Sequence, residues 1–115
     1  MKTLRIRIES LDDVKGAVSR ALNTGTPEAE AGLSFASYED MHRILSPKRL
    51  AIVRTMTGRP PTSIREIARL AGRDFKGVHT DVTALINAGV LDRGNDGVEF
   101  PYEAIHVEFD IEAAA

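Results

Sequence analysis

Positively charged and hydrogen-bonding side chains recur between residues 63 and 97, with spacings that suit contacts with phosphates and base edges. The basic members are Arg65, Arg69, Arg73, Lys76 and Arg93. Guanidinium and ammonium groups form charge-assisted hydrogen bonds with phosphate oxygens, and lysine, histidine and threonine side chains can reach the edges of bases. These residue types favour binding of a polyanion such as double-stranded DNA.

Charge is unevenly distributed along the 115 residues, although the formal net charge is only −2. Residues 46–94 contain 9 basic and 4 acidic residues and have a net charge of +5. Residues 1–45 have a net charge of −1, and residues 95–115 have one of −6. The acidic average alone argues against a nucleic-acid-binding protein, but the basic middle segment is the electrostatic pattern that such a protein needs.

Three helices are predicted between residues 46 and 88. Ser46-Pro47 starts the first, which runs to about Thr57 with Leu50, Ile52, Val53 and Met56 as its apolar residues, because proline at the first helical position loses an amide that would be unpaired. Ser63 and Glu66 form a capping-box pattern for the second, which has an apolar face of Ile64, Ile67, Ala68 and Ala71. Asp74 caps the third, which ends at Gly89 and buries Phe75, Val78, Val82, Leu85 and Ile86.

The exposed side of the third helix carries the predicted base contacts. At about 100° per residue, Arg73, Lys76, Gly77 and Thr80 point away from its apolar stripe, with His79 and Thr83 on one shoulder. Lys76 and His79 suit guanine acceptors, and Thr80 and Thr83 suit a base edge or a thymine methyl. We expect Arg65, Arg69 and Arg73 to clamp phosphates and Arg93 to enter the minor groove.

A short hairpin is predicted after the three helices. Residues 90–93 and 98–100 read as strands, and the Gly94-Asn95-Asp96-Gly97 turn joins them. Two helices joined by a tight glycine turn and followed by a hairpin form a winged helix-turn-helix, in which one helix enters the major groove. The predicted fold class is therefore α+β, with a winged helix-turn-helix over residues 46–100.

Strands are predicted near both ends of the chain. Apolar and charged residues alternate over 3–9 and over 104–111, a pattern with a period of two. Arg5 and Arg7 match the acidic row of the second strand, so the two strands are expected to form a small additional sheet. Ser10 starts a helix over 11–24, a short strand is possible over 33–36, and Ser37 starts a further helix. Residues 1–45 thus form a strand-helix segment, and residues 101–115 return to it as a strand and tail.

Other function classes find little support. The chain lacks cysteine, which excludes disulfides and thiolate chemistry, and His42, His79 and His106 lack metal-ligand spacing. We find no catalytic constellation and predict neither an enzyme nor a cofactor or metal site. The N-terminus has no continuous apolar run of the kind found in signal peptides, and no stretch is long enough to span a membrane. A cytoplasmic protein is expected.

The stretch SIREIARLAGRDFKGVHTDVTALINAGVLDR resembles the helix-turn-helix of MarR-like winged-helix regulators. With the flanks MKTLRIRI, LSPKRLAIVRTM and PYEAIHVEFDI, the whole chain resembles the small predicted transcriptional regulators of bacteria and archaea. The resemblance implies DNA binding, a homodimer and, in some members, an antitoxin role beside a small toxin. The long acidic C-terminal segment departs from the usual pattern of these regulators.

These observations predict a dimeric repressor that binds double-stranded DNA, with its own gene as one potential target. The apolar rows of the terminal strands exceed what one short helix can cover, so residues 1–45 and 102–111 are expected to form the dimer interface. The alternative is a protein-interaction module, such as an antitoxin that neutralises a small toxin, with or without DNA binding.

Overall fold

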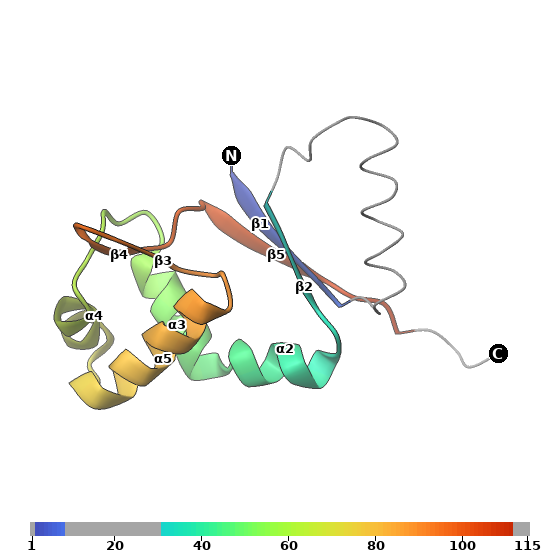
Figure 1. Ribbon diagram of the computed structural model, residues 1–115. Coiled ribbons are helices and arrows are strands. Elements are labelled where there is room, and N and C mark those ends of the chain that lie inside the picture. Colours follow the sequence, from blue (N-terminus) through green and yellow to red (C-terminus); the bar gives the residue numbers. More distant parts are fainter. Residues whose placement is uncertain (1, 9–30, 112–115) are drawn as a thin grey trace.

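The computed structural model describes residues 2–8 and 31–111 and has the predicted α+β class (Figure 1). A small parallel sheet lies beside a group of helices, and a short hairpin lies above the helices at the left of the view. The helix predicted over 11–24 lies outside the described residues. In chain order the elements are β1 Thr3–Ile8, β2 Ala31–Phe35, α2 Tyr38–Ile44, α3 Pro47–Met56, α4 Ile64–Ala71, α5 Phe75–Asn87, β3 Asp92–Gly94, β4 Gly97–Glu99 and β5 Ala104–Glu108.

The sheet confirms the predicted pairing of the two terminal strands. Its order is β2-β1-β5, and both neighbours run parallel to β1. Arg7 lies beside Glu108, with its Nε donating to a carboxylate oxygen at 2.8 Å, and a guanidinium nitrogen of Arg5 lies 3.9 Å from the same oxygen. Desolvation alone would raise the pKa of Glu108, but the hydrogen bond and charge of Arg7 lower it. The charge match inferred from alternating residues is therefore a real contact.

One face of the sheet joins the helices in a common hydrophobic core. Leu4 and Ile6 of β1 are 1% and 0% exposed. Because side chains alternate between the faces of a strand, Arg5 and Arg7 project from the opposite face. The other buried apolar residues come from the helices and the segments around the hairpin: Met41, Leu45, Ile52, Val53, Met56, Ile64, Ile67, Ala68, Val78, Val82, Leu85, Val90, Leu91, Val98 and Phe100.

The helices begin where the capping signals predict. The hydroxyls of Ser37 and Ser63 and the carboxylate of Asp74 each accept a hydrogen bond from the amide three residues later. Pro47 is the first residue of α3. Gly72 ends α4 with a φ of 67°, a left-handed conformation that glycine adopts without steric cost. Local sequence therefore sets these helix boundaries.

Two residues predicted to be buried are exposed. Leu50 is 38% exposed and Phe75 is 43% exposed. Leu50 lies in the second turn of α3, whose buried contacts come from Ile52, Val53 and Met56. Phe75 is the first residue of α5, and the buried stripe of that helix begins one turn later at Val78. Periodicity predicts which side of a helix is apolar, but it does not show how far the neighbouring elements extend along it.

The hairpin is attached to the segment before α4. Thr62 and Val98 exchange backbone hydrogen bonds of 2.8 and 2.9 Å, so Thr62 acts as a short third strand beside β4. Gly97 has a φ of 130°, and a Cβ atom there would lie 2.9 Å from the backbone of Thr62. Only glycine fits this close approach. Its position fixes the hairpin relative to α4.

We therefore expect Gly97→Ala to lower the free energy of unfolding by about 1 to 3 kcal/mol, since the variant adds both a steric clash and backbone strain. Denaturant unfolding followed by circular dichroism measures the change. Gly94→Ala is the matched control, because a Cβ atom at Gly94 meets no atom within 4 Å and its φ is not in the left-handed region. Equal stability of the two variants would show that the contact with Thr62 does not constrain the hairpin.

Candidate nucleic-acid interface

Helices α4 and α5 are joined by a three-residue turn and supported from behind by α3. Val78, Val82 and Leu85 of α5 are each 0% exposed and form its inner face. Gly72 ends α4 in a left-handed conformation, and Asp74 caps α5 two residues later. The outer face of α5 is thereby held rigidly at one end of the molecule, next to the β3–β4 hairpin (Figure 1).

An ion cluster centred on Asp81 fixes the orientation of α5. The Nε atom of Arg49, from α3, donates to Asp81 at 3.0 Å. Arg73, from the α4–α5 turn, places Nη1 2.8 Å from the other carboxylate oxygen, as an ion pair without an aligned hydrogen bond. The Asp81 side chain is only 14% exposed. One carboxylate therefore ties together α3, the turn and α5.

Burial and charge act in opposite directions on Asp81. Desolvation raises the pKa of its carboxyl group, whereas the hydrogen bond from Arg49, the close contact with Arg73 and the positive charges of both arginines lower it. The pKa of Asp81 is lowered overall. The group is thus ionised at neutral pH, and its two partners neutralise it.

Three of the predicted contact residues, from three different elements, meet in one open groove. Arg65 of α4, His79 of α5 and Arg93 of β3 line it together with Phe75 and Asn95. The guanidinium carbon of Arg65 lies 5.0 Å from the centre of the Phe75 ring, and the centre of the His79 ring lies 5.8 Å from the same point. The groove therefore combines cations, an aromatic surface and polar groups between a helix and a hairpin.

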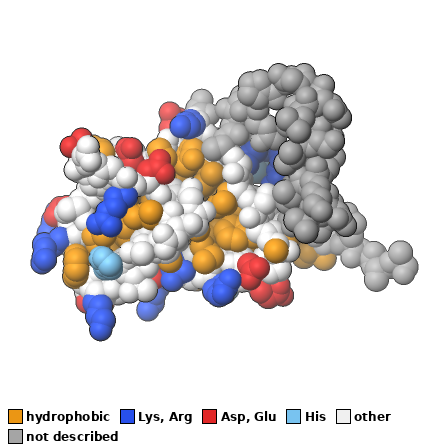
Figure 2. Space-filling view, viewed as in Figure 1, with side chains coloured by type: hydrophobic (Ala, Val, Ile, Leu, Met, Phe, Trp, Pro, Cys, Tyr) orange, Lys and Arg blue, Asp and Glu red, His pale blue; other side chains and the backbone are white. Residues whose placement is uncertain are grey.

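Lys76 and Thr80 extend this surface along α5. Both are exposed, and the Thr80 hydroxyl donates to the Lys76 carbonyl oxygen at 3.1 Å. Figure 2 shows basic side chains and a histidine on the end of the molecule formed by α4 and α5. Thr83 is half-buried, further along the same helix. Lys76 and Thr80 are thus exposed as predicted, and His79, predicted on one shoulder of the helix, is exposed as well.

Other predicted contact residues have partners within the protein. Arg73 is in the Asp81 cluster and not on the outer face, because the turn directs it back toward α5. Arg69 makes a double hydrogen bond with Glu66, and its side chain remains 69% exposed. The Gly77 amide donates to the Asp74 cap, and a Cβ atom at Gly77 would lie 3.0 Å from that carboxylate. Gly77 therefore serves the helix start.

Sequence reasoning missed Phe75 and Asn95 as groove residues and Arg49 and Asp81 as the ion cluster. Phe75 followed the apolar spacing of α5, and Asn95 counted only as a turn residue. The 32 residues that separate Arg49 from Asp81 conceal their contact. The one signal in the sequence for this cluster was Asp81 itself, a carboxylate in the middle of a basic helical segment. Such a group needs a cationic partner when it is buried.

No group of three or more acidic or histidine side chains that could hold a metal ion occurs within residues 2–8 and 31–111. In the same described part of the chain, none of the helices has the length and apolar character needed to cross a membrane.

Comparisons with known proteins bear on the family of the chain and on its fold. The family model HVO_A0114 matches residues 44–107, more than half of the 115 residues, so the chain belongs to the HVO_A0114 family. The fold is similar to that in a crystal structure of a predicted DNA-binding transcriptional regulator from E. coli, with a TM-score of 0.51 and 19% identity. That similarity covers 82% of this chain and 86% of the other. No curated protein sequence matches this chain.

Proposed function

We propose that this member of the HVO_A0114 family is a transcriptional regulator that binds double-stranded DNA, and that α4, α5 and the β3–β4 hairpin act as a winged helix-turn-helix. In this proposal α5 enters the major groove and the hairpin contacts the adjacent backbone or minor groove. The protein works by binding and not by catalysis, in the cytoplasm, as a MarR-like repressor.

The observation that carries the proposal is the meeting of Arg65, His79 and Arg93 at one groove. The three side chains come from two helices and a hairpin, and the turn, the Asp81 cluster and the Thr62–Val98 pairing hold these elements in place. Such convergence suits phosphate contacts beside a helix that reads base edges. The E. coli neighbour, described as a predicted DNA-binding regulator, supports the same reading at the level of the fold.

In this proposal the active form is a homodimer joined through residues 1–45 and 102–111. A single unit of this size covers only a few base pairs, and two copies related by a two-fold axis would contact two half-sites. The terminal strands lie on the side of the molecule away from α4 (Figure 1). Their location leaves the α4–α5 end accessible to DNA.

The proposal is tested with a labelled DNA fragment from upstream of the protein's own gene and a random duplex of equal length. Lys76→Ala should weaken binding to the specific fragment by about 1 to 3 kcal/mol and to random DNA much less, if Lys76 contacts a base. Fluorescence anisotropy at a fixed moderate salt concentration measures both. Equal weakening on both duplexes would make Lys76 a backbone contact, and no binding of either duplex by the wild-type protein would overturn the proposed function.

A second candidate function is a protein-interaction module, such as an antitoxin that neutralises a small toxin. The observation that favours it is an exposed apolar surface far from α4: Tyr38 is 48%, Phe109 43% and Ile111 90% exposed. The test is co-expression with the product of the neighbouring gene. Purification of a defined complex of the two proteins, together with no binding of DNA by this protein, would favour this alternative. The two roles can also coexist.

A further inference from the structure

Strand β5 lies at an edge of the described sheet. β1 pairs with one side of it, and the sheet order ends with β5. Its side chains are accessible: Val107 is 41% exposed, and the side chain of His106 is 53% exposed. An accessible strand edge offers unpaired amides and carbonyls to another strand.

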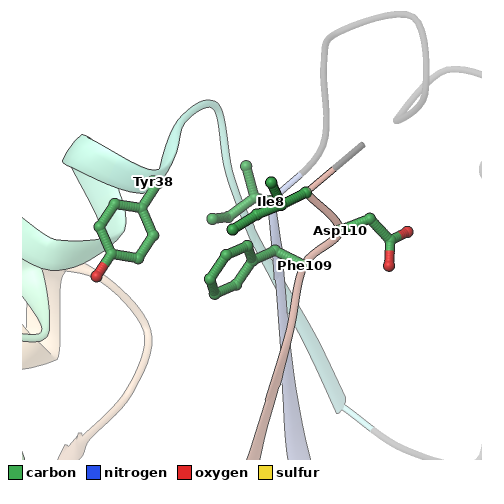
Figure 3. A pocket seen from close by; sticks show the side chains of 5 residues that line it. Ile8, Tyr38, Phe109 and Asp110 are labelled. Atoms are coloured by element: carbon green, nitrogen blue, oxygen red, sulfur yellow. The ribbon is translucent and has the colours of Figure 1, made fainter. Parts of the chain in front are cut away.

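The apolar row of β5 loses its cover toward the C-terminal end of the strand. Ile105 is half-buried, whereas Val107, Phe109 and Ile111 are exposed. Tyr38, Phe109 and Ile8 line an open apolar hollow (Figure 3), where the centres of the Tyr38 and Phe109 rings lie 5.3 Å apart and the carboxylate of Asp110 points away. The C-terminal part of this apolar row is therefore not covered by other described residues of the same copy.

We infer that a second copy of this chain pairs with β5, with the two β5 strands antiparallel around a two-fold axis at Val107. This inference rests on the dimer in the proposed function and specifies its geometry. Two sheets of the order β2-β1-β5 would then join into one continuous six-stranded sheet. A self-complementary edge of this kind is the isologous contact that a two-fold dimer requires.

The charges of the strand select this register. Residues that lie opposite each other in an antiparallel pair project from the same face. With Val107 on the axis, His106 of each copy lies opposite Glu108 of the other, and Ile105 lies opposite Phe109. The polar face then pairs a histidine with a carboxylate twice, and the apolar face pairs apolar side chains throughout this span.

Neighbouring registers lose this complementarity. A shift that places the axis between two residues would put apolar side chains opposite charged ones. An axis at His106 brings the two histidines face to face, an axis at Glu108 brings two carboxylates together, and an axis at Phe109 sets Glu108 against Asp110. Like charges directly opposite each other destabilise a strand pair, so Val107 remains the favoured axis.

The absence of cysteine from the sequence makes a single-cysteine experiment clean. In the inferred dimer the two Cα atoms of residue 107 lie about 4.5 to 5.5 Å apart, within the range of a disulfide. The Cα atoms of residue 109 would be four positions out of register, about 14 Å apart. With diamide as oxidant, Val107→Cys should form mostly disulfide-linked dimer on a non-reducing gel, and Phe109→Cys at least tenfold less.

Equal cross-linking of the two variants, or none at position 107 in a folded protein, would overturn the inference. Circular dichroism of Val107→Cys confirms folding, and the exposure of Val107 makes the substitution tolerable. The cross-linking is done without DNA, so its outcome is independent of DNA binding. A cross-linked dimer that binds no DNA would contradict the proposed function only, whereas a DNA-binding protein without cross-links at position 107 would contradict this inference only.

Substitution of His106 gives a second, independent readout. His106→Glu places carboxylates opposite each other in the inferred register and should weaken dimerisation at least tenfold in analytical ultracentrifugation. His106→Lys is the matched control, because it places a positive charge opposite Glu108 and should preserve the dimer. Equal dimer dissociation constants for the two variants would contradict the inferred register.

Discussion

Asp81→Asn is expected to lower the free energy of unfolding by about 2 to 4 kcal/mol, because it leaves two largely buried arginines without their common counter-ion. The side chains of Arg49 and Arg73 are 18% and 26% exposed, so water compensates only partly for the lost carboxylate. Asparagine has nearly the same shape as aspartate. The loss therefore reports the charge and not a cavity.

Urea unfolding followed by circular dichroism measures this loss. Asp40→Asn is the matched control: its side chain is 46% exposed and pairs with Arg43 on the surface, where such a pair contributes at most about 1 kcal/mol. The expected order is a large loss for Asp81→Asn and a small one for Asp40→Asn. Similar small losses for both would mean that the Asp81 cluster does not hold α3, the turn and α5 together.

The same cluster predicts an acid dependence of stability. The pKa of Asp81 is lower in the folded protein than its ordinary value of 3.8, so the unfolded state binds its proton first as the pH falls. Stability from this group is complete well above that value and is lost as the pH decreases below it. Asp81→Asn should therefore show a smaller decrease in stability between neutral pH and acid than the wild-type protein.

Much of the fold was predictable because local signals determine it. Ser63, Asp74 and Pro47 set helix starts through their own hydrogen bonds or fixed φ angles, and these effects need no tertiary contact. Alternating residues in the two terminal strands identified both strands and the charge match between Arg7 and Glu108. The parallel direction of the pair could not be predicted, since alternation is the same for either direction.

The candidate site was predictable only in part. Arg65, His79 and Arg93 have residue types that suit DNA contacts, but their convergence depends on where the hairpin lies relative to α4. The Thr62–Val98 pairing sets that position, and the steric demand of Gly97 against Thr62 is a contact between distant segments. Helical periodicity predicted Arg73 on the outer face, because periodicity contains no information about ion pairs. In the structure Arg73 turns toward Asp81.

The second large effect is expected at the groove itself. In the proposed complex Arg65 and Arg93 contact phosphates from the groove that they line beside α5, and hydrogen bonds to charged groups contribute about 1.5 to 3 kcal/mol each before losses from solvent exposure. Arg65→Ala with Arg93→Ala should therefore weaken binding to all duplexes about 10- to 100-fold at a fixed salt concentration. Both residues are exposed, so the fold should be retained.

Arg43→Ala is the matched control, since it removes an exposed arginine from α2, away from α4 and the hairpin (Figure 1). It should leave DNA affinity nearly unchanged. Circular dichroism and thermal unfolding of all three proteins separate a loss of binding from a loss of folding.

The measurement that tests the central claim most directly is the salt dependence of DNA affinity for the wild-type protein, the Arg65/Arg93 double variant and the Arg43 control. Each phosphate contact contributes about 0.9 to the slope of log affinity against log salt concentration. We expect the double variant to lose nearly two units of slope and Arg43→Ala to retain the wild-type slope. Identical affinities and slopes for the double variant and the wild-type protein would show that the face formed by α4, α5 and the hairpin does not bind DNA.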